Sequence, residues 1–414
     1  MLIGACHPTV GPNARLQVCL RAYSSRKHNR LADFTPPEMS RSPLESLVLY
    51  LLASGYGTPA EVLGQTIDPP TQRALANAEA VLLEVGAIAA EDHERDAHGK
   101  LTAAARQSKR QLTPLGRHLA KLPVEVHLGK MMIFGAVFGC LDPVLTIASS
   151  VSHGSPFVAP FNKREAADAA RCKFMGAGES DLLAMLAAHR AWERSVGKAR
   201  VVFCRENFVS ESVMTTIAGL KREYAGLISS LGFDTATTGP ANTNAADTEV
   251  VKAVIVAGLY PQVAVLTKRA SAPPVLALQN GGEARVHPSS SIASLRASGG
   301  GGGGVERCAV FASKLKTSDT YCRDCTLVGP VPILLFAEEV AVQHDQGVIV
   351  VDGWIKIRAP AKTAVIFKGL KAELNAVLAQ KSADPRLPVD RIPLVRAIVQ
   401  LISSGAPPPP PPPH

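Results

Sequence analysis

The sequence lacks the short motifs that mark the commonest nucleotide-dependent and hydrolytic enzymes. Its 414 residues contain no G-x-x-x-x-G-K-[ST] phosphate-binding loop and no D-E-x-H acidic motif, so they offer no P-loop site for ATP and magnesium. The G-x-S-x-G and H-E-x-x-H patterns of serine hydrolases and zinc proteases are absent as well. We therefore expect no catalytic residue, cofactor or metal in this chain, and a function based on binding.

Long apolar runs are also missing, although there is enough apolar material for a core. Hydrophobic residues make up 46% of the chain and charged residues 19%. A helix that spans a bilayer needs roughly 18 to 20 predominantly apolar residues in a row. The best candidate, residues 131–141, is shorter and is followed by Asp142. It predicts a buried helix, and no membrane partner is expected.

Acidic residues are fewer than basic ones. Lys and Arg number 44 against 35 Asp and Glu, which gives a net charge of +9. This balance favours a polyanionic partner, such as nucleic acid or an anionic surface. The eight cysteines are spread thinly, as is typical of free thiols in a reducing compartment. Cys322 and Cys325 form a lone C-x-x-C, which indicates two strand residues, with a zinc or redox site as the alternative.

The first 32 residues contain no acidic residue. Their basic residues are Arg15, Arg21, Arg26, Lys27 and Arg30. Such a segment can be an organelle transit peptide. The competing interpretation is the end of a folded domain, described below, and it favours a cytoplasmic or nuclear protein.

Residues 43–112 have the pattern of a winged helix. Ser42 is expected to cap a helix whose first turn contains Pro43, and Gly55 should end it. A second helix should follow residues 68–70 and end at Gly86. A polar hairpin is expected over residues 91–109.

Residues 113–234 are predicted to form a helical bundle, and residues 235–249 a linker. Thr113 and Pro114 are typical of a helix start, and Pro123 of a break. An apolar helix should follow and stop at residues 141–143. Ser180 is expected to cap another helix.

Residues 250–404 are predicted to form an OB-like β-barrel with terminal helices. Short alternating runs indicate five strands, at residues 263–266, 284–287, 308–313, 320–327 and 347–357. The glycine-rich segment 297–305 should form a flexible loop. Pro407–Pro413, within the tail 405–414, should adopt a polyproline II conformation that could bind an SH3- or WW-type domain. The fold class is thus multidomain α+β.

Several of these segments resemble one known family. Residues 113–157, TPLGRHLAKLPVEVHLGKMMIFGAVFGCLDPVLTIASSVSHGSPF, resemble the helicase-associated ratchet region of DEAH-box RNA helicases. Residues 18–45 resemble the end of the second RecA-like lobe of their motor, so residues 1–42 would be a poorly ordered remnant of it. VKAV with GLYP, VHPSS, KLKTSDTYCRDCT and DGWI, in this order, are similar to motifs of the family's OB-fold. The resemblance implies a C-terminal region without the RecA-like motor lobes.

The resemblance also implies that the barrel lies against RNA. The residue types suit phosphate or 2′-hydroxyl groups, and the candidates are His287, Ser289, Ser290, Lys314, Lys316, Thr317 and Arg323. Further candidates in the ratchet are Arg117, Lys121 and Lys130, which could share a helix edge. The alternatives are structural: a turn at His287, an internal ion pair between Arg323 and Asp324, and a solvated charged face.

Three functional hypotheses follow. The first is an RNA-binding accessory region of a DEAH-box ATP-dependent RNA helicase, which grips single-stranded RNA without sequence preference; ATP and magnesium would belong to the family's motor. The second is a truncated product of a gene for a complete ATP-dependent helicase. The third is an interaction module for an activator protein of the G-patch kind. Whether the chain is an enzyme stays open, and catalysis by this chain alone is not expected.

Overall fold

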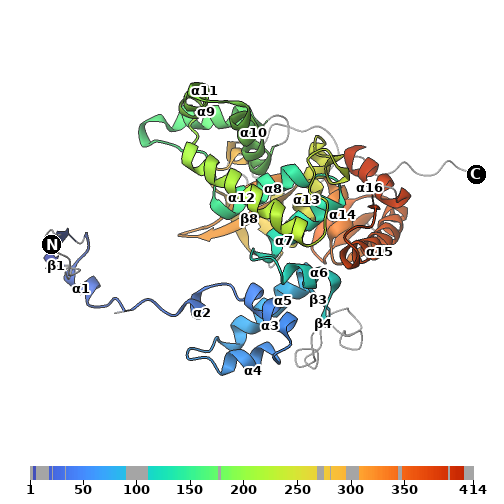
Figure 1. Cartoon of the computed structure of the whole chain (residues 1–414), viewed down its shortest axis with the longest axis horizontal. Helices are drawn as coiled ribbons and strands as arrows, with labels where there is room; N and C mark the ends of the chain where they lie inside the picture. The colour runs from blue at the N-terminus through green and yellow to red at the C-terminus, as the bar shows by residue number, and fades with distance from the viewer. Residues whose placement is uncertain are drawn as a thin grey trace, which may run out of the picture.

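The computed structural model describes residues 3–5, 18–20, 22–32, 34–89, 111–175, 179–267, 275–279, 281–294, 307–343, 347–389 and 392–404. Its N-terminal elements extend away from the main body (Figure 1). Strand β1 (Ile3–Ala5) pairs antiparallel with β2 (Val18–Leu20). Two one-turn helices follow, α1 (Ser25–His28) and α2 (Glu38–Arg41).

Helices and a short two-stranded ladder form the next unit. They are α3 (Glu45–Ser54), α4 (Pro59–Gly64), α5 (Gln72–Val85), β3 (Ile88–Ala89) and β4 (Gln111–Leu112). The predicted helix ends at Gly55 and Gly86 are confirmed, since both adopt the left-handed conformation. The predicted cap at Ser42 is wrong: Ser42 closes α2, and Leu44 precedes α3 without a side-chain cap.

Helix α4 is an addition to the two predicted helices. Thr58 and Glu61 form a reciprocal capping box, in which the Thr58 hydroxyl accepts from the Glu61 N–H at 3.3 Å and the Glu61 carboxylate accepts from the Thr58 N–H at 3.1 Å. The hairpin predicted over residues 91–109 lies outside the described residues. Three helices and a ladder are compatible with a winged helix, which stays a prediction.

A helical domain follows. Its helices are α6 (Pro114–Leu119), α7 (Val126–Val137), α8 (Leu141–His153), α9 (Arg164–Met175), α10 (Asp181–Arg194), α11 (Lys198–Glu206) and α12 (Glu211–Ser230). The predicted break at Pro123 is confirmed. The predicted stop at residues 141–143 is wrong: α7 ends at Val137, Gly139 has a φ of +67°, and α8 starts at Leu141. An acid and a proline suit the first turn of a helix, and Asp142 and Pro143 lie there.

Helix α13 (Thr248–Leu259) occupies the centre of the molecule. It follows the 3-10 helix η5 (Pro240–Asn242), and its residues from Val250 onwards are buried. A Cβ on Gly258 would lie 2.5 Å from the Cβ and 2.9 Å from the Cα of Met131 on α7. The two helices therefore pack backbone to backbone, and their apolar side chains belong to one continuous core.

A closed five-stranded barrel follows α13, in the order β5-β6-β7-β9-β8. The strands are β5 (Val263–Thr267), β6 (Val275–Leu278), β7 (Glu283–Val286), β8 (Cys308–Lys316) and β9 (Thr320–Val328). Four of these strands were predicted. The fifth prediction is wrong, because residues 347–357 form two strands outside the barrel, and β6 takes the fifth place.

The C-terminal part packs against α13 through its first and last helices. It contains α14 (Pro330–Phe336), a separate sheet of β10 (Val340–Gln343), β11 (Val348–Val351) and β12 (Ile355–Arg358), and the helices α15 (Ala361–Ala383) and α16 (Pro393–Ser404). The terminal helices are thus as predicted. The glycine-rich segment 297–305 and the tail 405–414 lie outside the described residues.

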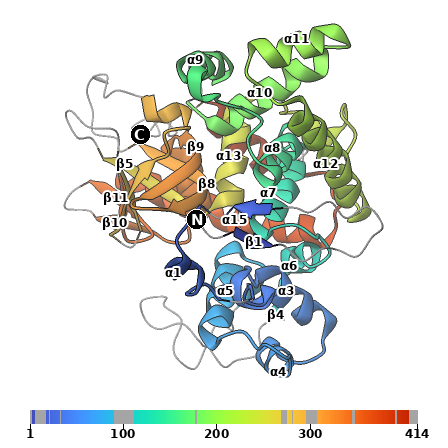
Figure 2. The same cartoon turned by 90° about the vertical axis from the view of Figure 1, so that its left-hand side faces the viewer.

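The arrangement places the barrel on one side of α13 and helices α7, α8 and α12 on the other, with α3 to α5 beneath and α9 to α11 above (Figure 2). The chain is a mixed α+β protein with a helical part followed by a closed barrel. Within the described ranges, no helix combines the length and apolar character that a membrane crossing requires.

Candidate nucleic-acid interface

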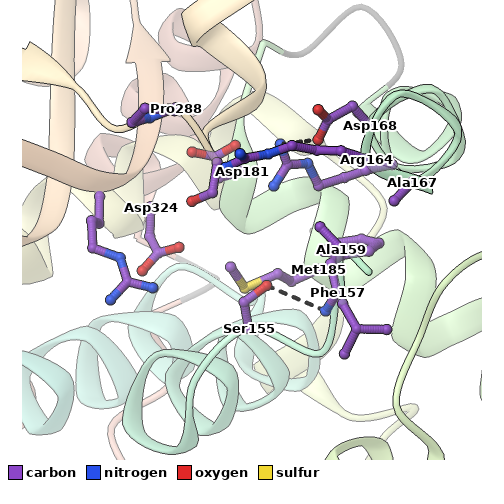
Figure 3. Close-up of a pocket in the computed structure, with 14 residues that line it drawn as sticks. Ser155, Phe157, Ala159, Arg164, Ala167, Asp168, Asp181, Met185, Pro288 and Asp324 are labelled. Carbon is purple, nitrogen blue, oxygen red and sulfur yellow. Dashed lines mark hydrogen bonds and ion pairs between the residues drawn. The ribbon is translucent and has the colours of Figure 1, made fainter. Parts of the chain in front are cut away.

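A cavity of about 220 Å³ lies where the helical domain meets the barrel (Figure 3). Its walls come from the loop after α8, from α9 and the start of α10, and from two barrel segments, the turn after β7 and strand β9. The polar residues that line it are Ser155, Arg164, Asp168, Arg171, Asp181, Ser289, Arg323 and Asp324. Residues distant in sequence thus form one polar surface.

The start of α10 fastens the helical domain to the barrel. Ser180 caps α10, as predicted, by accepting from the Leu183 N–H at 3.1 Å. Its hydroxyl also lies 2.7 Å from that of Thr326 on β9. The buried Asp181 carboxylate accepts from the Ser290 hydroxyl and, at 3.0 Å, from the Cys325 N–H. These buried polar contacts fix the two walls of the cavity relative to each other.

The predicted H-P-S-S segment forms a tight turn at the cavity rim. His287 Nδ1 lies 2.6 Å from the Ser289 hydroxyl and accepts from the Ser289 N–H at 3.1 Å. Ser289 lines the cavity, whereas Ser290 is buried and its hydroxyl donates to Asp181. Ser290 therefore has a structural role here, and Ser289 is the accessible member of the pair.

Three arginines surround the turn. Burial lowers the pKa of His287, and the nearby Arg323, Arg164 and Arg171 lower it further. His287 is therefore neutral at pH 7, and its ring makes an edge contact with Tyr321, with 5.8 Å between centroids. Asp181 acts in the opposite direction on the pKa of His287, but the three guanidinium groups near the turn are of the kind that pairs with a phosphate.

Two of these arginines have unused hydrogen-bonding capacity. The Nε atoms of Arg171 and Arg323 are buried and have no hydrogen-bond partner among the described residues. Arg171 reaches Asp168 at 3.5 Å through Nη2. A buried donor without an acceptor is costly, and both side chains line the cavity, where their guanidinium groups could pair with an anion.

Arg164 and Arg171 were not among the predicted site residues. Their spacing of seven was the available signal, since positions i and i+7 share a helix face. Arg323 was predicted, and it lines the cavity. The tertiary structure was required to show that Arg164 and Arg171 line the same cavity as Arg323.

Asp324 is the acidic counterpart of this cluster. Burial and the neighbouring Asp181 raise its pKa to about 6, against the lowering effect of Arg323 and Arg171. Its φ is +54°, a left-handed conformation that Asp and Asn adopt more readily than most residues. The Asp324 carboxyl group therefore loses its proton less readily than an ordinary aspartate.

The other predicted barrel residues lie in the half of the β8–β9 hairpin that contains its turn. Lys314, Lys316 and Thr317 are exposed, and Thr317 belongs to the turn, where its N–H donates to the Asp319 carbonyl at 2.9 Å. Lys314 Nζ lies 5.8 Å from the Phe311 ring centroid. None of the three lines the cavity, so they form a separate basic edge.

The predicted ratchet residues do not share one helix edge. Arg117 belongs to α6, Lys121 follows that helix, and Lys130 belongs to α7. Arg117 and Lys121 are exposed, but Lys130 is half-buried and its Nζ lies 5.7 Å from the Phe134 ring centroid. Burial lowers the pKa of Lys130 to about 8. Lys130 is therefore part of the packing around α7.

Cys322 and Cys325 are strand residues, as the simpler interpretation predicted. Both are buried free thiols on β9. Burial raises the pKa of Cys322 to about 11. In the part of the chain that is described, no group of three or more His, Cys, Asp or Glu side chains could hold a metal ion.

Family comparisons agree with this architecture. Residues 125–212 match the helicase associated domain (HA2), ratchet-like, and residues 251–340 match the oligonucleotide/oligosaccharide-binding (OB)-fold. Residues 347–404 match the C-terminal domain in RNA helicases. The fold and the cavity therefore define a helicase-associated region with an OB fold.

The curated relatives that the chain matches are helicases. The chain is 33% identical over 403 residues to the ATP-dependent RNA helicase DHX29 of Homo sapiens, which covers 93% of this chain and 28% of the relative. It is 33% identical to the ATP-dependent DNA/RNA helicase DHX36 of Mus musculus (90% and 36%) and 30% identical to the DExH-box ATP-dependent RNA helicase DExH1 of Arabidopsis thaliana (97% and 38%). The chain is similar to the C-terminal region of these DEAH-box RNA helicases. It spans between 28% and 38% of these relatives' length.

Proposed function

We propose that this chain binds single-stranded RNA in the cavity between the helical domain and the barrel, as an accessory region of an ATP-dependent RNA helicase. The observation that carries the proposal is the convergence of Arg164, Arg171 and Arg323 from two domains around one turn. Guanidinium groups pair with phosphates in a bidentate geometry. The Ser289 hydroxyl adds a hydrogen-bonding group of the kind that contacts phosphate or 2′-hydroxyl oxygens.

The same geometry favours binding without sequence preference. The cavity lining contains three guanidinium groups, three carboxylates and small polar groups, and its guanidinium and hydroxyl groups suit the backbone of a nucleic acid and read no base edges. Single-strand binders of this type combine a positive groove with stacking surfaces. In this role the chain needs no ATP site of its own, and hydrolysis would belong to the motor of a complete helicase.

The test is salt-dependent binding of a single-stranded RNA of about 15 nucleotides, measured by fluorescence anisotropy. The wild-type chain should bind oligo-U and oligo-A with similar affinity, and binding should weaken between about 50 and 200 mM salt. A DNA oligonucleotide of the same sequence reports on the 2′-hydroxyl contribution. Absence of binding at low salt would refute the proposal.

A double variant locates the site. Arg164→Ala with Arg171→Ala should reduce the affinity and flatten the salt dependence by about two counterions. Arg222→Ala is the matched control, because Arg222 is an exposed arginine on α12 and does not line the cavity. Equal losses in both variants would indicate nonspecific binding to a basic surface.

A second candidate function is docking of an activator peptide, for which the family resemblance suggests the G-patch kind. The unit of α3, α4, α5, β3 and β4, which we propose to be the winged helix, exposes Tyr50, Tyr56 and Ile67. Exposed apolar side chains that gather on one unit favour a protein partner. Titration of a G-patch peptide into wild type and Tyr56→Ala tests this: no binding, or binding unchanged by the substitution, excludes this surface.

A further inference from the structure

An exposed apolar ledge lies beside the cavity, in the loop between α8 and α9. Val158 and Phe161 are both exposed, and Phe161 is exposed completely. Val158 itself lines the cavity, as do Ala159 before Phe161 and Arg164 after it. Single exposed apolar residues are ordinary, but Phe161 lies in sequence between two lining residues, Ala159 and Arg164, of a cavity that contains three arginines.

The ledge is held in place by backbone contacts. The Val158 N–H donates to the Phe208 carbonyl at 2.9 Å, and the Ser210 N–H donates to the Pro156 carbonyl at 2.9 Å. Pro160 precedes Phe161, which starts the 3-10 helix η3 (Phe161–Lys163) that runs directly into α9. The loop thus presents the Phe161 ring on a fixed backbone. Binding of a ligand to the ring would therefore cost the protein little conformational entropy.

The charged side chains beside Phe161 indicate what kind of ligand would bind there. Lys163 and Arg164 are exposed two and three residues after Phe161, and Arg171 lies seven residues after Arg164, on the same face of α9. A nucleotide carries both groups that this arrangement can use: a flat apolar base for the ring and an anionic phosphate for the guanidinium groups. The nearby acids are partly engaged, since Asp168 pairs with Arg171 and Asp181 accepts from Ser290 and Cys325.

We propose that Phe161 is a stacking platform for one base of the single-stranded RNA, next to the phosphate held by the arginines. This inference rests on the proposed function and adds a base contact to it. Because every base has a π-face, the contact strengthens binding without reading the sequence. Val158 provides apolar contact beside the ring.

The experiment compares two ligands of equal length, an RNA of about 15 nucleotides and the same backbone without bases. Phe161→Ala should weaken RNA binding by about 10-fold and leave the affinity for the abasic strand unchanged. Phe161→Tyr should retain the wild-type affinity. The salt dependence should stay as in the wild type, because stacking releases no counterions. Phe34→Ala is the matched control, since Phe34 is an exposed phenylalanine far from the cavity in sequence.

A second readout detects stacking directly. An RNA with one 2-aminopurine should lose fluorescence on binding the wild-type chain, and this quenching should be absent with Phe161→Ala. If the wild type binds RNA and Phe161→Ala matches it in affinity and quenching, the stacking platform is refuted while the proposed function stands. An equal loss on the abasic strand also refutes it. If the wild type binds neither ligand, the proposed function itself fails.

Discussion

Single residues in the cavity differ in how far their chemistry is already satisfied. Asp181 and Ser290 bond to each other, and Ser289 to His287. Arg171 and Arg323 each keep a buried Nε without an acceptor among the described residues. Within the short turn, Ser290 is therefore structural and Ser289 is accessible, while the two arginines retain hydrogen-bonding capacity at the cavity.

Substitutions of Arg323 should separate its charge from its geometry. Arg323→Ala should weaken single-stranded RNA binding by about 10-fold and reduce the salt slope by about one. Arg323→Lys should keep the slope and still lose about threefold in affinity, because an ammonium lacks the planar fork. Anisotropy titrations over a salt series measure both quantities. An Arg323→Ala variant with wild-type slope would place Arg323 outside the RNA contact.

Asp324 should make RNA binding depend on pH. Its folded pKa of about 6 lies above the ordinary aspartate pKa of 3.8, so the native state binds more protons between these values. The ionised Asp324 carboxylate destabilises the folded state. This destabilisation is absent below about pH 3.8 and complete above about pH 6. A nearby phosphate favours the protonated carboxyl, so wild-type affinity should fall as pH rises through 6.

Asp324→Asn tests this, since Asn tolerates the same left-handed backbone. At about pH 5 the variant and the wild type should bind RNA alike, and at about pH 7.5 the variant should bind a few-fold more tightly. His287 contributes equally to both proteins and cancels in the comparison. An identical pH profile for the two proteins would contradict a role for the Asp324 charge.

At the scale of elements, the sequence predicted best where a local rule decides the outcome. Gly55, Gly86 and Ser180 ended or capped helices as predicted, because cap chemistry needs only neighbouring residues. The helix stop predicted at residues 141–143 was wrong, because an acid and a proline suit either the end of one helix or the start of the next. The barrel strand at residues 275–278 was missed, because its pairing with β5 and β7 is a tertiary property.

The junction of α10 with β9 should be important for stability. Asp181→Ala removes the acceptor of the Ser290 hydroxyl and of the Cys325 N–H. Leaving these buried donors unpaired should lower the free energy of unfolding by about 2 kcal/mol. Asp168→Ala is the control, because its pair with Arg171 is partly exposed and should contribute less than about 0.5 kcal/mol. Urea denaturation compares them, and equal stability of the two variants would contradict the account.

The contact of α13 with α7 should tolerate no added methyl group. Gly258→Ala would place a Cβ 2.5 Å from that of Met131, and the overpacking should cost about 1–3 kcal/mol. Gly226→Ala on α12 meets nothing within 4 Å and should be neutral or stabilising by up to about 1 kcal/mol. Thermal unfolding of both variants checks the difference. A stable Gly258→Ala protein would show that the two helices are packed less tightly.

At the scale of the whole molecule, the site is a product of domain assembly. The sequence identified the barrel residues of the turn and of β9 through their motifs. It could not show that α9 lies opposite them, because residues 164–171 and 323 are far apart in sequence and are brought together by the packing of α9 and α10 against the barrel. The candidate site therefore combines a part that was predictable from sequence with a part that required the fold.

Crosslinking reports whether RNA occupies the junction between the helical domain and the barrel. A single-stranded RNA containing 4-thiouridine, bound to the full chain and irradiated, should crosslink to peptides from both walls, namely residues 155–171 and residues 285–290 or 321–326. Arg164→Ala with Arg171→Ala should remove these crosslinks together. Crosslinks confined to α3, α4 and α5, or unaffected by the double variant, would contradict the account.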